Sequence, residues 1–309
     1  MITVKNLSKN YGERVAIENL NFEVKKGEVV GFLGPNGAGK STTMKIVTGM
    51  LAASSGQVLV DGLDTFDHPL ETKKKIGFLP EFPPLYEDMV VEDYLVYVAK
   101  LARVPEKNIA ENVYMALEAT SLLAVRGRYI PHLSKGFRQR VGISQALVSQ
   151  PDILILDEPT VGLDPKQVSQ IRELLLSFKG KYTVVLSTHI LSEVQATCDR
   201  AIIIDQGRII AEDSIENLQK NIMGKQQVFI KVLRNQDQVV ADLKKMDLNM
   251  SVNKTADQII VELPSGKEDL EQISSKIVQL NAGLVEFHVR SQMDLEQVFL
   301  QLTSKENPS

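Results

Sequence analysis

Residues 34–41 read Gly-Pro-Asn-Gly-Ala-Gly-Lys-Ser, a complete G-x-x-x-x-G-K-[ST] phosphate loop. The apolar run before it, Glu28 to Leu33, predicts a buried strand, and the stretch from Thr42 onward predicts a helix. Glycines let the backbone curl so that successive N–H groups point at phosphate, and the following helix presents its positive end there. Lys40 adds a full positive charge. This strand, loop and helix therefore predict a site for a nucleoside triphosphate.

A second apolar run, Ile153 to Leu156, is followed by two carboxylates, Asp157 and Glu158. A parallel strand delivers the residues at its carboxyl end to the crevice where ligands bind. We therefore expect Asp157 to reach the Mg²⁺ that bridges the phosphates, together with the Ser41 hydroxyl, and Glu158 to polarise an attacking water. Taken alone, an acidic pair at a strand end is more often a surface cap. Its combination with the phosphate loop favours hydrolysis.

The composition narrows the class of protein. The 309 residues can form one large domain or two of ordinary size, and we expect two. A formal net charge of -4 provides no basic field for sequence-independent binding to DNA, so no nucleic-acid partner is expected. Cys198 is the only cysteine, which excludes an internal disulfide and a multi-cysteine metal site. The sequence has no signal segment and no apolar stretch near the roughly 20 residues of a membrane span, which predicts a cytoplasmic chain.

The hydrophobic pattern predicts an α/β core built from three parts. Roughly the first 80 residues alternate short apolar runs with Gly and Asn turns, which indicates a strand-rich, antiparallel subdomain. From about residue 88 to 150 the apolar spacing is helical, which indicates a helical insert. Buried parallel strands at 153–156 and 183–186, separated by a helix at 168–178, then complete a domain that is expected to cover 1–222.

Residues 225–303 predict a second, smaller α+β domain. Its expected elements follow the order β-α-β-β-α-β, the split arrangement of ferredoxin-like folds. The predicted strands are 227–233, 248–253, 258–263 and 284–290, and the predicted helices are 236–246 and 267–280. An amphipathic stretch at 294–302 is expected to form a closing helix, followed by a tail at 304–309.

A second anion site is indicated by Leu133-Ser-Lys-Gly-Phe137, which runs into a helical stretch. Ser134 is predicted to be the N-cap of that helix, and Gly136 to lie in its first turn. A helix that starts with these residues can bind an anion, yet the chain already has one site for a triphosphate. The extra site implies a second molecule.

Three segments together, 34–41, 133–137 and 156–160, resemble the nucleotide-binding subunit of ABC (ATP-binding cassette) transporters. Their order and spacing match the family over roughly residues 1–220. The resemblance implies a P-loop NTPase core, ATP and Mg²⁺ as ligands, and ATP hydrolysis coupled to transport.

The same resemblance implies that two cassettes, as a homodimer or a mixed pair, sandwich two ATP molecules head to tail. Ser134 and Gly136 of one subunit would complete the ATP site that contains Lys40 of the other. Asp164 lies where the family places a loop that contacts the partner across this dimer. Such a dimer accounts for the second anion site.

Two more residues gain an expected role from the resemblance. Tyr11 matches the aromatic residue that stacks on adenine, and His189 matches the switch histidine that contacts the γ-phosphate and positions the water. Without the resemblance, a histidine at a strand end is more often structural. The expected site thus comprises Tyr11, Gly34, Pro35, Asn36, Gly37, Ala38, Gly39, Lys40, Ser41, Thr42, Ser134, Gly136 and Asp164 for ATP, with Glu158 and His189 as catalytic residues.

The chain departs from the family pattern at three positions. Lys135 and Phe137 replace the first Gly and the Gln of the usual Leu-Ser-Gly-Gly-Gln signature. Glu81 stands where many relatives have a glutamine that senses Mg²⁺ and connects to the membrane subunit. Because a carboxylate can still ligate Mg²⁺ directly or through water, the expected metal ligands are Ser41, Glu81 and Asp157.

The stretch Leu79-Pro-Glu81, the following Leu85-Tyr86 and the ferredoxin-like tail resemble one branch of this family. Cassettes of that branch pair with separate integral membrane permeases and export drugs, ions, lipids or polysaccharides, and a gliding-motility subset is similar. The resemblance implies a cytoplasmic protein, peripheral on the inner face of the cell membrane, that moves a permease through residues 82–86. It leaves the transported substrate open.

Two other classes of function compete with a transport subunit. A cassette ATPase that acts in translation or DNA maintenance usually has long coiled-coil inserts or two cassettes in one chain, and this sequence has neither. A small-molecule kinase or a GTPase uses the same phosphate loop, but the segment 133–137 has no role in either. The sequence also has no Asn-Lys-x-Asp guanine motif, which argues against GTP.

Overall fold

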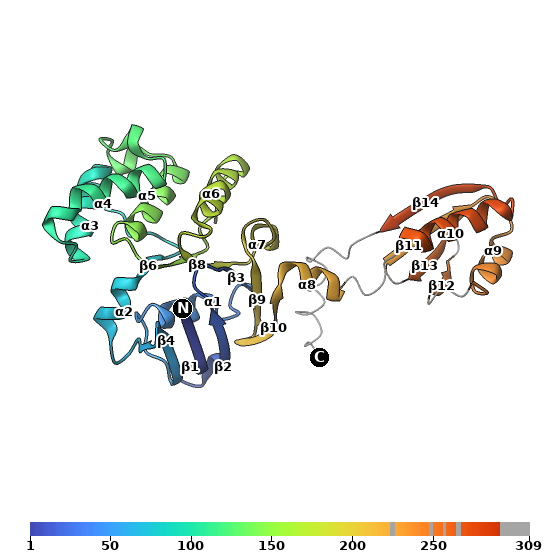
Figure 1. The fold of residues 1–309 in the computed structure, drawn as a ribbon, viewed down its shortest axis with the longest axis horizontal. Helices are drawn as coiled ribbons and strands as arrows, with labels where there is room; N and C mark the ends of the chain where they lie inside the picture. The colour runs from blue at the N-terminus through green and yellow to red at the C-terminus, as the bar shows by residue number, and fades with distance from the viewer. Residues whose placement is uncertain (223–225, 247–249, 256–257, 264–266, 291–309) are drawn as a thin grey trace. The chain divides into compact units, whose positions relative to one another are not determined.

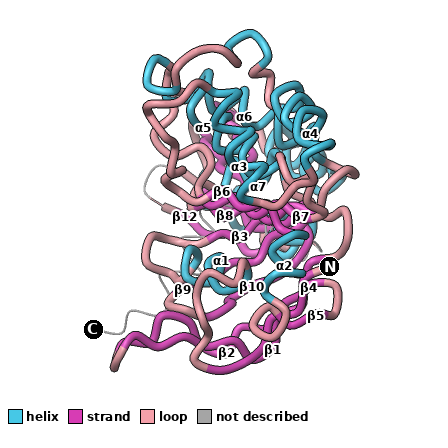
Figure 2. The backbone as a smooth tube through the Cα atoms, turned by 90° about the vertical axis from the view of Figure 1, so that its left-hand side faces the viewer, coloured by secondary structure: helices cyan, strands magenta, loops and turns pink. Residues whose placement is uncertain are grey.

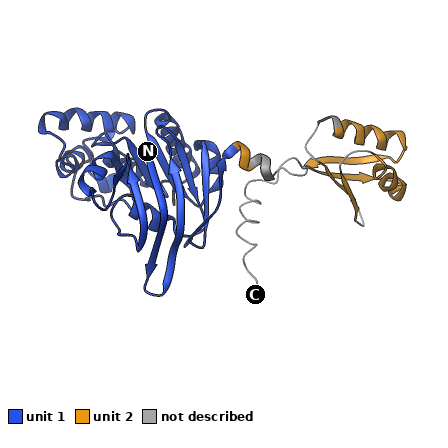
Figure 3. Cartoon of the chain, turned by 60° about the horizontal axis from the view of Figure 1, so that its bottom comes forward, with its two compact units in different colours: residues 1–215 blue, residues 216–309 orange. Residues whose placement is uncertain are grey.

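The computed structural model describes residues 1–222, 226–246, 250–255, 258–263 and 267–290. The chain divides into two compact units, Met1–Ile215 and Glu216–Ser309, which Figure 3 colours separately. Each unit has its own hydrophobic core. The domain limits expected from the sequence, 1–222 and 225–303, stay a prediction.

Unit 1 begins with a four-stranded antiparallel sheet in the order β2-β1-β4-β5. Its strands are β1 (Ile2–Tyr11), β2 (Arg14–Val24), β4 (Ser55–Val60) and β5 (Leu63–Asp64). Gly12, with φ of 61°, makes the tight turn between β1 and β2, because a left-handed backbone costs glycine little. This sheet is the strand-rich, antiparallel part of the predicted fold class.

A six-stranded sheet in the order β10-β9-β3-β8-β7-β6 forms the centre of unit 1 (Figure 1). Its strands are β3 (Val29–Leu33), β6 (Ile76–Leu79), β7 (Ile153–Asp157), β8 (Thr183–Thr188), β9 (Arg200–Asp205) and β10 (Arg208–Ser214). All neighbours are parallel except β9 and β10. Every residue of β3, β7 and β8 is buried, which is why their sequences are mainly apolar, with polar residues only at the ends of β7 and β8.

Helices cover both faces of the six-stranded sheet. α1 (Lys40–Val47) lies between this sheet and the antiparallel one, whereas α6 (Pro165–Phe178) and α7 (Leu191–Thr197) lie on the opposite face (Figures 1 and 2). Met44, Ile46 and Val47 of α1 belong to one core cluster with apolar residues of both sheets. α6 begins three residues before the predicted start at 168, because Asp164 caps it and Pro165 fits its first turn.

The segment between β6 and β7 is helical, as the apolar spacing predicted. It contains α3 (Val91–Leu101), α4 (Glu106–Ala119), two short 3₁₀ turns at Leu123–Val125 and Ile130–His132, and α5 (Lys135–Leu147). A Cβ atom at Gly77 of β6 would overlap the carbonyl oxygen of Ala146 in α5. Gly77 therefore allows α5 to approach the edge of the sheet. Unit 1 also contains the short helix α2 (Pro69–Lys75), which directly precedes β6 in the chain.

Unit 2 contains a second antiparallel sheet in the order β12-β13-β11-β14. Its elements are α8 (Ile215–Ile222, whose first residue belongs to unit 1), β11 (Gln226–Val232), α9 (Gln236–Leu243), β12 (Ser251–Lys254), β13 (Ile259–Leu263), α10 (Lys267–Gln279) and β14 (Leu284–Arg290). The order β-α-β-β-α-β after α8 is the one predicted from the sequence. The expected closing helix at 294–302 and the tail at 304–309 lie outside the described residues. No helix within the described ranges is long and apolar enough to cross a membrane.

Candidate functional site

The order of three neighbouring strands brings the predicted catalytic segments together. β8 lies between β3 and β7. In the register of the sheet, Leu33 pairs with Thr188 and Asp157 pairs with Ser187. The phosphate loop, the segment that begins at His189 and the two carboxylates after β7 therefore leave the sheet at the same edge. Residues of the phosphate loop, His189 and Glu158 line a cavity of about 1070 Å³ there, whereas Asp157, the last residue of β7, is not among its lining residues.

The phosphate loop curls because two of its glycines have left-handed backbones, with φ of 84° at Gly37 and 105° at Gly39. A Cβ atom at Gly39 would lie 2.6 Å from Cγ2 of Ile17 and 2.8 Å from the carbonyl oxygen of Ala16. No other residue type fits that position without moving β2. The next residue, Lys40, begins α1, so the N-terminal end of this helix faces the cavity.

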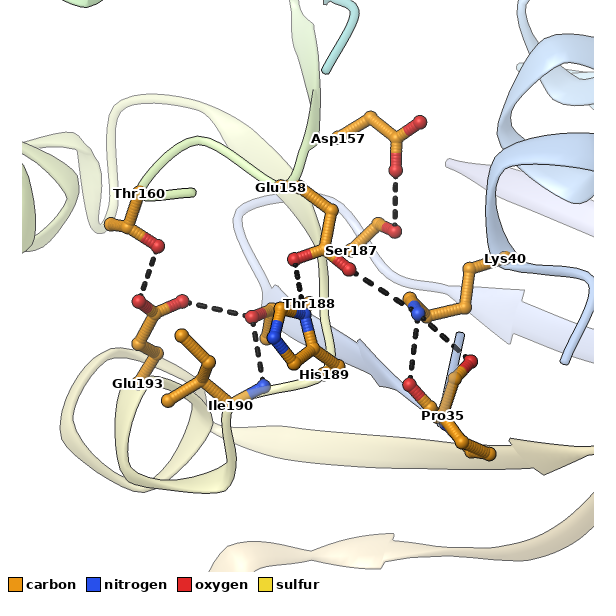
Figure 4. Close-up of polar contacts among 11 residues, drawn as sticks. Pro35, Lys40, Asp157, Glu158, Thr160, Ser187, Thr188, His189, Ile190 and Glu193 are labelled. Carbon is orange, nitrogen blue, oxygen red and sulfur yellow. Dashed lines mark hydrogen bonds and ion pairs between the residues drawn. The ribbon is translucent and has the colours of Figure 1, made fainter. Parts of the chain in front are cut away.

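The side chain of Lys40 is buried at the base of the loop, with 5% exposed. Its Nζ atom donates to the carbonyl oxygens of Gly34 at 2.8 Å and Pro35 at 3.1 Å. The same ammonium lies 3.2 Å from Oε1 of Glu158 (Figure 4). A buried cation needs such partners, because burial of an unpaired charge is costly.

Glu158 is held from both its backbone and its side chain. Its backbone has φ of 49°, a left-handed conformation that costs a residue with a Cβ atom about 1–3 kcal/mol. Its N–H donates to the carbonyl oxygen of Ser187 at 2.8 Å, which ties this strained position to β8. Its Oε2 atom lies 2.8 Å from Nδ1 of His189. Because an ionised carboxylate only accepts, Nδ1 of His189 is the donor.

Asp157 is 2% exposed and accepts a hydrogen bond from Oγ of Ser187 at 2.7 Å on its Oδ1 atom. No group of three or more His, Cys, Asp or Glu residues within the described ranges forms a metal cage. The oxygen donors here are the Asp157 carboxylate and, in the lining of the cavity, Ser41 and Glu81. This small all-oxygen set fits Mg²⁺, which binds through one or two carboxylates together with substrate phosphates.

A second, smaller cavity of about 200 Å³ lies at the starts of two helices. Ser134 is the N-cap of α5 and accepts from the N–H of Phe137, as predicted. Asp164 is the N-cap of α6 and accepts from the N–H of Gln167 at 2.9 Å. This second cavity is lined by Ser134, Gly136, Phe137, Arg140, Asp164, Lys166, Gln167 and Gln170.

The first cavity gathers most of the residues singled out in the sequence. Ten of them line it, namely Tyr11, Asn36, Gly37, Gly39, Lys40, Ser41, Thr42, Glu81, Glu158 and His189. Gly34 and Pro35 contribute carbonyl oxygens to Lys40, and Ala38 is buried behind the loop. Ser134, Gly136 and Asp164 line the second cavity instead. The structure thus separates the expected ATP residues into two groups.

Six residues that line the first cavity were missed in the sequence: Arg14, Val15, Ala16, Val161, Gly162 and Gln206. Gln206 lies in the turn between β9 and β10, about 170 residues from the phosphate loop. Val161 and Gly162 lie between the segment 156–160 and Asp164, both singled out in the sequence, whereas Arg14, Val15, Ala16 and Gln206 belong to no motif and only the packing of the chain could reveal them. Lys135, a departure from the signature, has its amine against Gly162, where an added Cβ atom would overlap Nζ.

The model of the family described as "ABC transporter" matches residues 17–161. The lantibiotic transport ATP-binding protein SrtF of Streptococcus pyogenes is 39% identical over 224 residues, which cover 71% of this chain and 95% of SrtF. The bacitracin transport ATP-binding protein BcrA of Bacillus licheniformis is 36% identical and covers 71% of this chain and 72% of its own length.

A relative that matches both units is YhcH of Bacillus subtilis, an ABC transporter ATP-binding protein. It is 31% identical over 307 residues, which cover 99% of this chain and 96% of YhcH. Among solved structures, the dimeric ATP-binding cassette MJ0796 with ADP and Pi has a TM-score of 0.63 and 27% identity. That match covers 70% of this chain and 99% of MJ0796.

Proposed function

This chain belongs to the family of ATP-binding subunits of ABC transporters, and from that premise we propose that it drives a separate integral membrane permease by closing and opening a head-to-tail dimer of cassettes. The chain binds ATP and is an ATPase that powers transport. The assignment of residues, the dimer, the permease and the direction of transport are the proposed parts.

The observation that carries the assignment is the position of the Glu158 carboxylate between Lys40 and His189. Lys40 binds the terminal phosphates of ATP with the backbone N–H groups of residues 36–41. Glu158 accepts the proton of the attacking water, which a carboxylate at a cavity wall can do. His189 orients that carboxylate through Nδ1.

Mg²⁺ would be held by Ser41, Asp157 and Glu81, and it would neutralise charge on the terminal phosphates. The Ser187 hydroxyl orients the Asp157 carboxylate through Oδ1. Tyr11, whose ring is 48% exposed at the rim of the cavity, stacks on adenine. Thr42 and the remaining loop residues complete the contacts to phosphate.

Two features support a head-to-tail dimer. Ser134 and Gly136 lie with Asp164 in a second cavity, away from Lys40 of the same chain. A site of this kind is useful if it faces the ATP bound by another subunit. The related cassette MJ0796 is dimeric in its structure with ADP and Pi. The partner is a second copy of this chain or a related cassette.

The permease is proposed to bind an aromatic surface next to the ATP site, formed by Phe82, Tyr86 and Tyr97. Phe82 is 77% exposed, and the rings of Tyr86 and Tyr97 lie 5.5 Å apart. Glu81, which lines the ATP cavity, is adjacent to Phe82 in the chain. Movement at Glu81 would thereby reach the permease, and the protein would act at the inner face of the cell membrane. The names of SrtF and BcrA, which are ATP-binding proteins of lantibiotic and bacitracin transport, support a role in transport, and export is the proposed direction.

The first test is the ATPase activity of the full chain over a series of protein concentrations, for wild type, Glu158→Gln and the matched control Glu106→Gln. Glu106 is a carboxylate of the same type whose side chain is 81% exposed. We expect Glu158→Gln to bind ATP, to remain a dimer with ATP in size-exclusion chromatography, and to lose at least about 100-fold in turnover. Turnover in Glu158→Gln within twofold of the control would contradict the assigned base.

The head-to-tail arrangement has its own test, which mixes two inactive variants. Lys40→Ala lacks the phosphate-binding amine, and Ser134→Arg blocks the second cavity. A head-to-tail mixed dimer has one ATP site with both Lys40 and Ser134 intact, so activity should return when the variants are combined. A mixture as inactive as each variant alone would argue that both residues act on the ATP of their own chain.

A further inference from the structure

Glu193 is a buried carboxylate that the proposed mechanism does not use. It lies in the first turn of α7 and is 3% exposed. It is absent from the lining of the ATP cavity, so it does not reach the ligand directly. Figure 4 shows it beside the segments that carry Glu158 and His189.

Both oxygen atoms of Glu193 accept hydrogen bonds from buried hydroxyl groups. Oγ1 of Thr160 donates to Oε1, and Oγ1 of Thr188 donates to Oε2 at 2.9 Å. Thr188 also accepts from the N–H of Ile190 at 3.1 Å. The hydroxyl of Thr188 therefore connects Glu193 to the backbone on both sides of residue 189.

The two threonines flank the proposed catalytic pair. Thr160 follows Glu158 by two residues, and Thr188 directly precedes His189. Within the pair, Oε2 of Glu158 lies 2.8 Å from Nδ1 of His189. A single carboxylate thus connects the segment after β7 with the segment after β8, next to the contact that the two segments make.

Burying a carboxylate costs free energy, so packing alone does not explain why Glu193 occupies this buried position. Burial raises the pKa of Glu193, and the negative charge of Glu158 raises it further, whereas the hydroxyls of Thr160 and Thr188 and the charge of Arg172 lower it. An apolar side chain at this position would pack without that desolvation cost. What an apolar side chain could not do is accept two hydrogen bonds from two different segments.

We propose that Glu193 is a positioning residue for ATP hydrolysis, which sets the approach of His189 to Glu158 by holding Thr188 and Thr160. This inference rests on the proposed roles of Glu158 and His189. Hydrolysis is sensitive to such a contact, because a displacement of about 1 Å at a reacting group can cost about 100-fold in rate.

The test compares Glu193→Ala and Glu193→Gln with the control Thr197→Val. Thr197 is a buried residue of the same helix, and its hydroxyl donates to the backbone carbonyl of Glu193 rather than to Thr160 or Thr188. We expect kcat to fall about 100-fold in Glu193→Ala and about 10-fold in Glu193→Gln, with the KM for ATP within about threefold of wild type. Thr197→Val should keep the kcat of wild type.

The glutamine variant keeps the volume of the side chain and one acceptor oxygen, so it should fold even if Glu193→Ala does not. Thermal unfolding of each variant distinguishes a positioning role of Glu193 from a purely structural one. A loss of kcat at an unchanged Tm supports positioning. A fall in Tm with full kcat, or equal losses of kcat and ATP affinity, would assign Glu193 a structural role and overturn the proposal.

Thr160→Val tests whether the effect passes through the hydrogen bonds. If it does, Thr160→Val should lower kcat about 10-fold, and adding it to Glu193→Ala should cost little more than Glu193→Ala alone, because that change already removes the acceptor of the Thr160 hydroxyl. Additive losses would overturn the proposal. Glu158→Gln in the same assay separates the proposed base from the proposed positioning residue. If Glu158→Gln retains turnover, the assignment of Glu158 as the base is wrong. If Glu158→Gln is inactive while Glu193→Gln is fully active, only the positioning role of Glu193 is contradicted.

Discussion

Nζ of Lys40 lies 3.2 Å from Oε1 of Glu158, and the two side chains are 5% and 6% exposed. This buried ion pair connects the phosphate loop at the end of β3 with the residue that follows β7. The pair therefore links segments that follow two strands between which β8 lies in the sheet. The ammonium and the carboxylate therefore influence stability as well as chemistry.

The first prediction concerns the stability of variants of this pair in the absence of nucleotide. Lys40→Ala should lower the free energy of unfolding by about 3 kcal/mol, because it leaves the Glu158 carboxylate buried without its cation. The double variant Lys40→Ala, Glu158→Gln should recover much of that loss, since the stranded charge is removed. Urea denaturation of four proteins, namely wild type, Lys40→Ala, Glu158→Gln and the double variant, measures these changes. Strictly additive effects of the two single changes would contradict a coupled pair.

A second prediction concerns the shape of the phosphate loop. A Cβ atom at Gly34 would overlap the carbonyl oxygen of Ile204 and lie 2.8 Å from its Cγ2 atom. Gly34→Ala should therefore destabilise the protein by about 1–3 kcal/mol and weaken ATP binding, because either the loop or β9 must move.

The matched control for Gly34 is Gly127→Ala, since a Cβ atom at Gly127 would meet no heavy atom within 4 Å. This change should alter stability by less than about 0.5 kcal/mol and leave ATP affinity intact. Chemical denaturation and fluorescence titration with a labelled nucleotide measure the two properties. Equal behaviour of both alanine variants would argue that the loop tolerates a side chain at residue 34.

The third prediction is a dependence of stability on alkaline pH. Tyr94 is 2% exposed, and its hydroxyl contacts Oε1 of Gln145 in α5. Burial raises its pKa from 10.0 to about 12. Because the folded pKa lies above the unfolded one, the contribution of Tyr94 is fully present below pH 10 and is lost as the pH rises toward 12. The total loss of unfolding free energy from this titration is about 3 kcal/mol, because each pKa unit corresponds to about 1.4 kcal/mol.

Tyr94→Phe removes both the hydrogen bond and the titration. The free energy of unfolding of Tyr94→Phe should be about 1 kcal/mol below that of wild type at pH 7. This difference should shrink as the pH rises above 10, because only the wild type loses stability through the titration of Tyr94. Tyr114→Phe, at a tyrosine that is 49% exposed, is the control and should follow the wild type at every pH. Urea unfolding between pH 7 and 11 provides the comparison. If the free energy of unfolding of Tyr94→Phe falls as steeply as that of wild type above pH 10, the result would argue against the raised pKa of Tyr94.

Much of the fold was predictable because its signals are local. The strand, loop and helix around residues 34–41, the cap at Ser134 and the β-α-β-β-α-β order of unit 2 all depend on residues close in sequence. The start of α6 was predicted three residues too late, because a capping Asp164 and Pro165 have less weight than apolar spacing in such a prediction. The phosphate loop was recognisable for the same reason, since it is one continuous segment of the sequence.

Other parts of the site depend on contacts between distant segments. The lining residues Arg14, at the start of β2, and Gln206, in the turn between β9 and β10, belong to no motif. Glu193 would have been taken for one more polar residue of a short helix, yet it is buried and joins two strand ends. Neither position has a periodicity or a spacing that indicates its partners.

The sequence by itself determined that this chain has a phosphate loop and a pair of carboxylates that follow an apolar run, and it predicted a second anion site that implies a partner. The tertiary structure decided that β8 lies between β3 and β7, and this order is what brings the Glu158 carboxylate into contact with both Lys40 and His189. It also placed Ser134 and Asp164 in a cavity of their own. The physical reason is that apolar runs specify buried strands but contain little information on which strands pair, because all three can form the same backbone hydrogen bonds and only their packing against the helices selects one order.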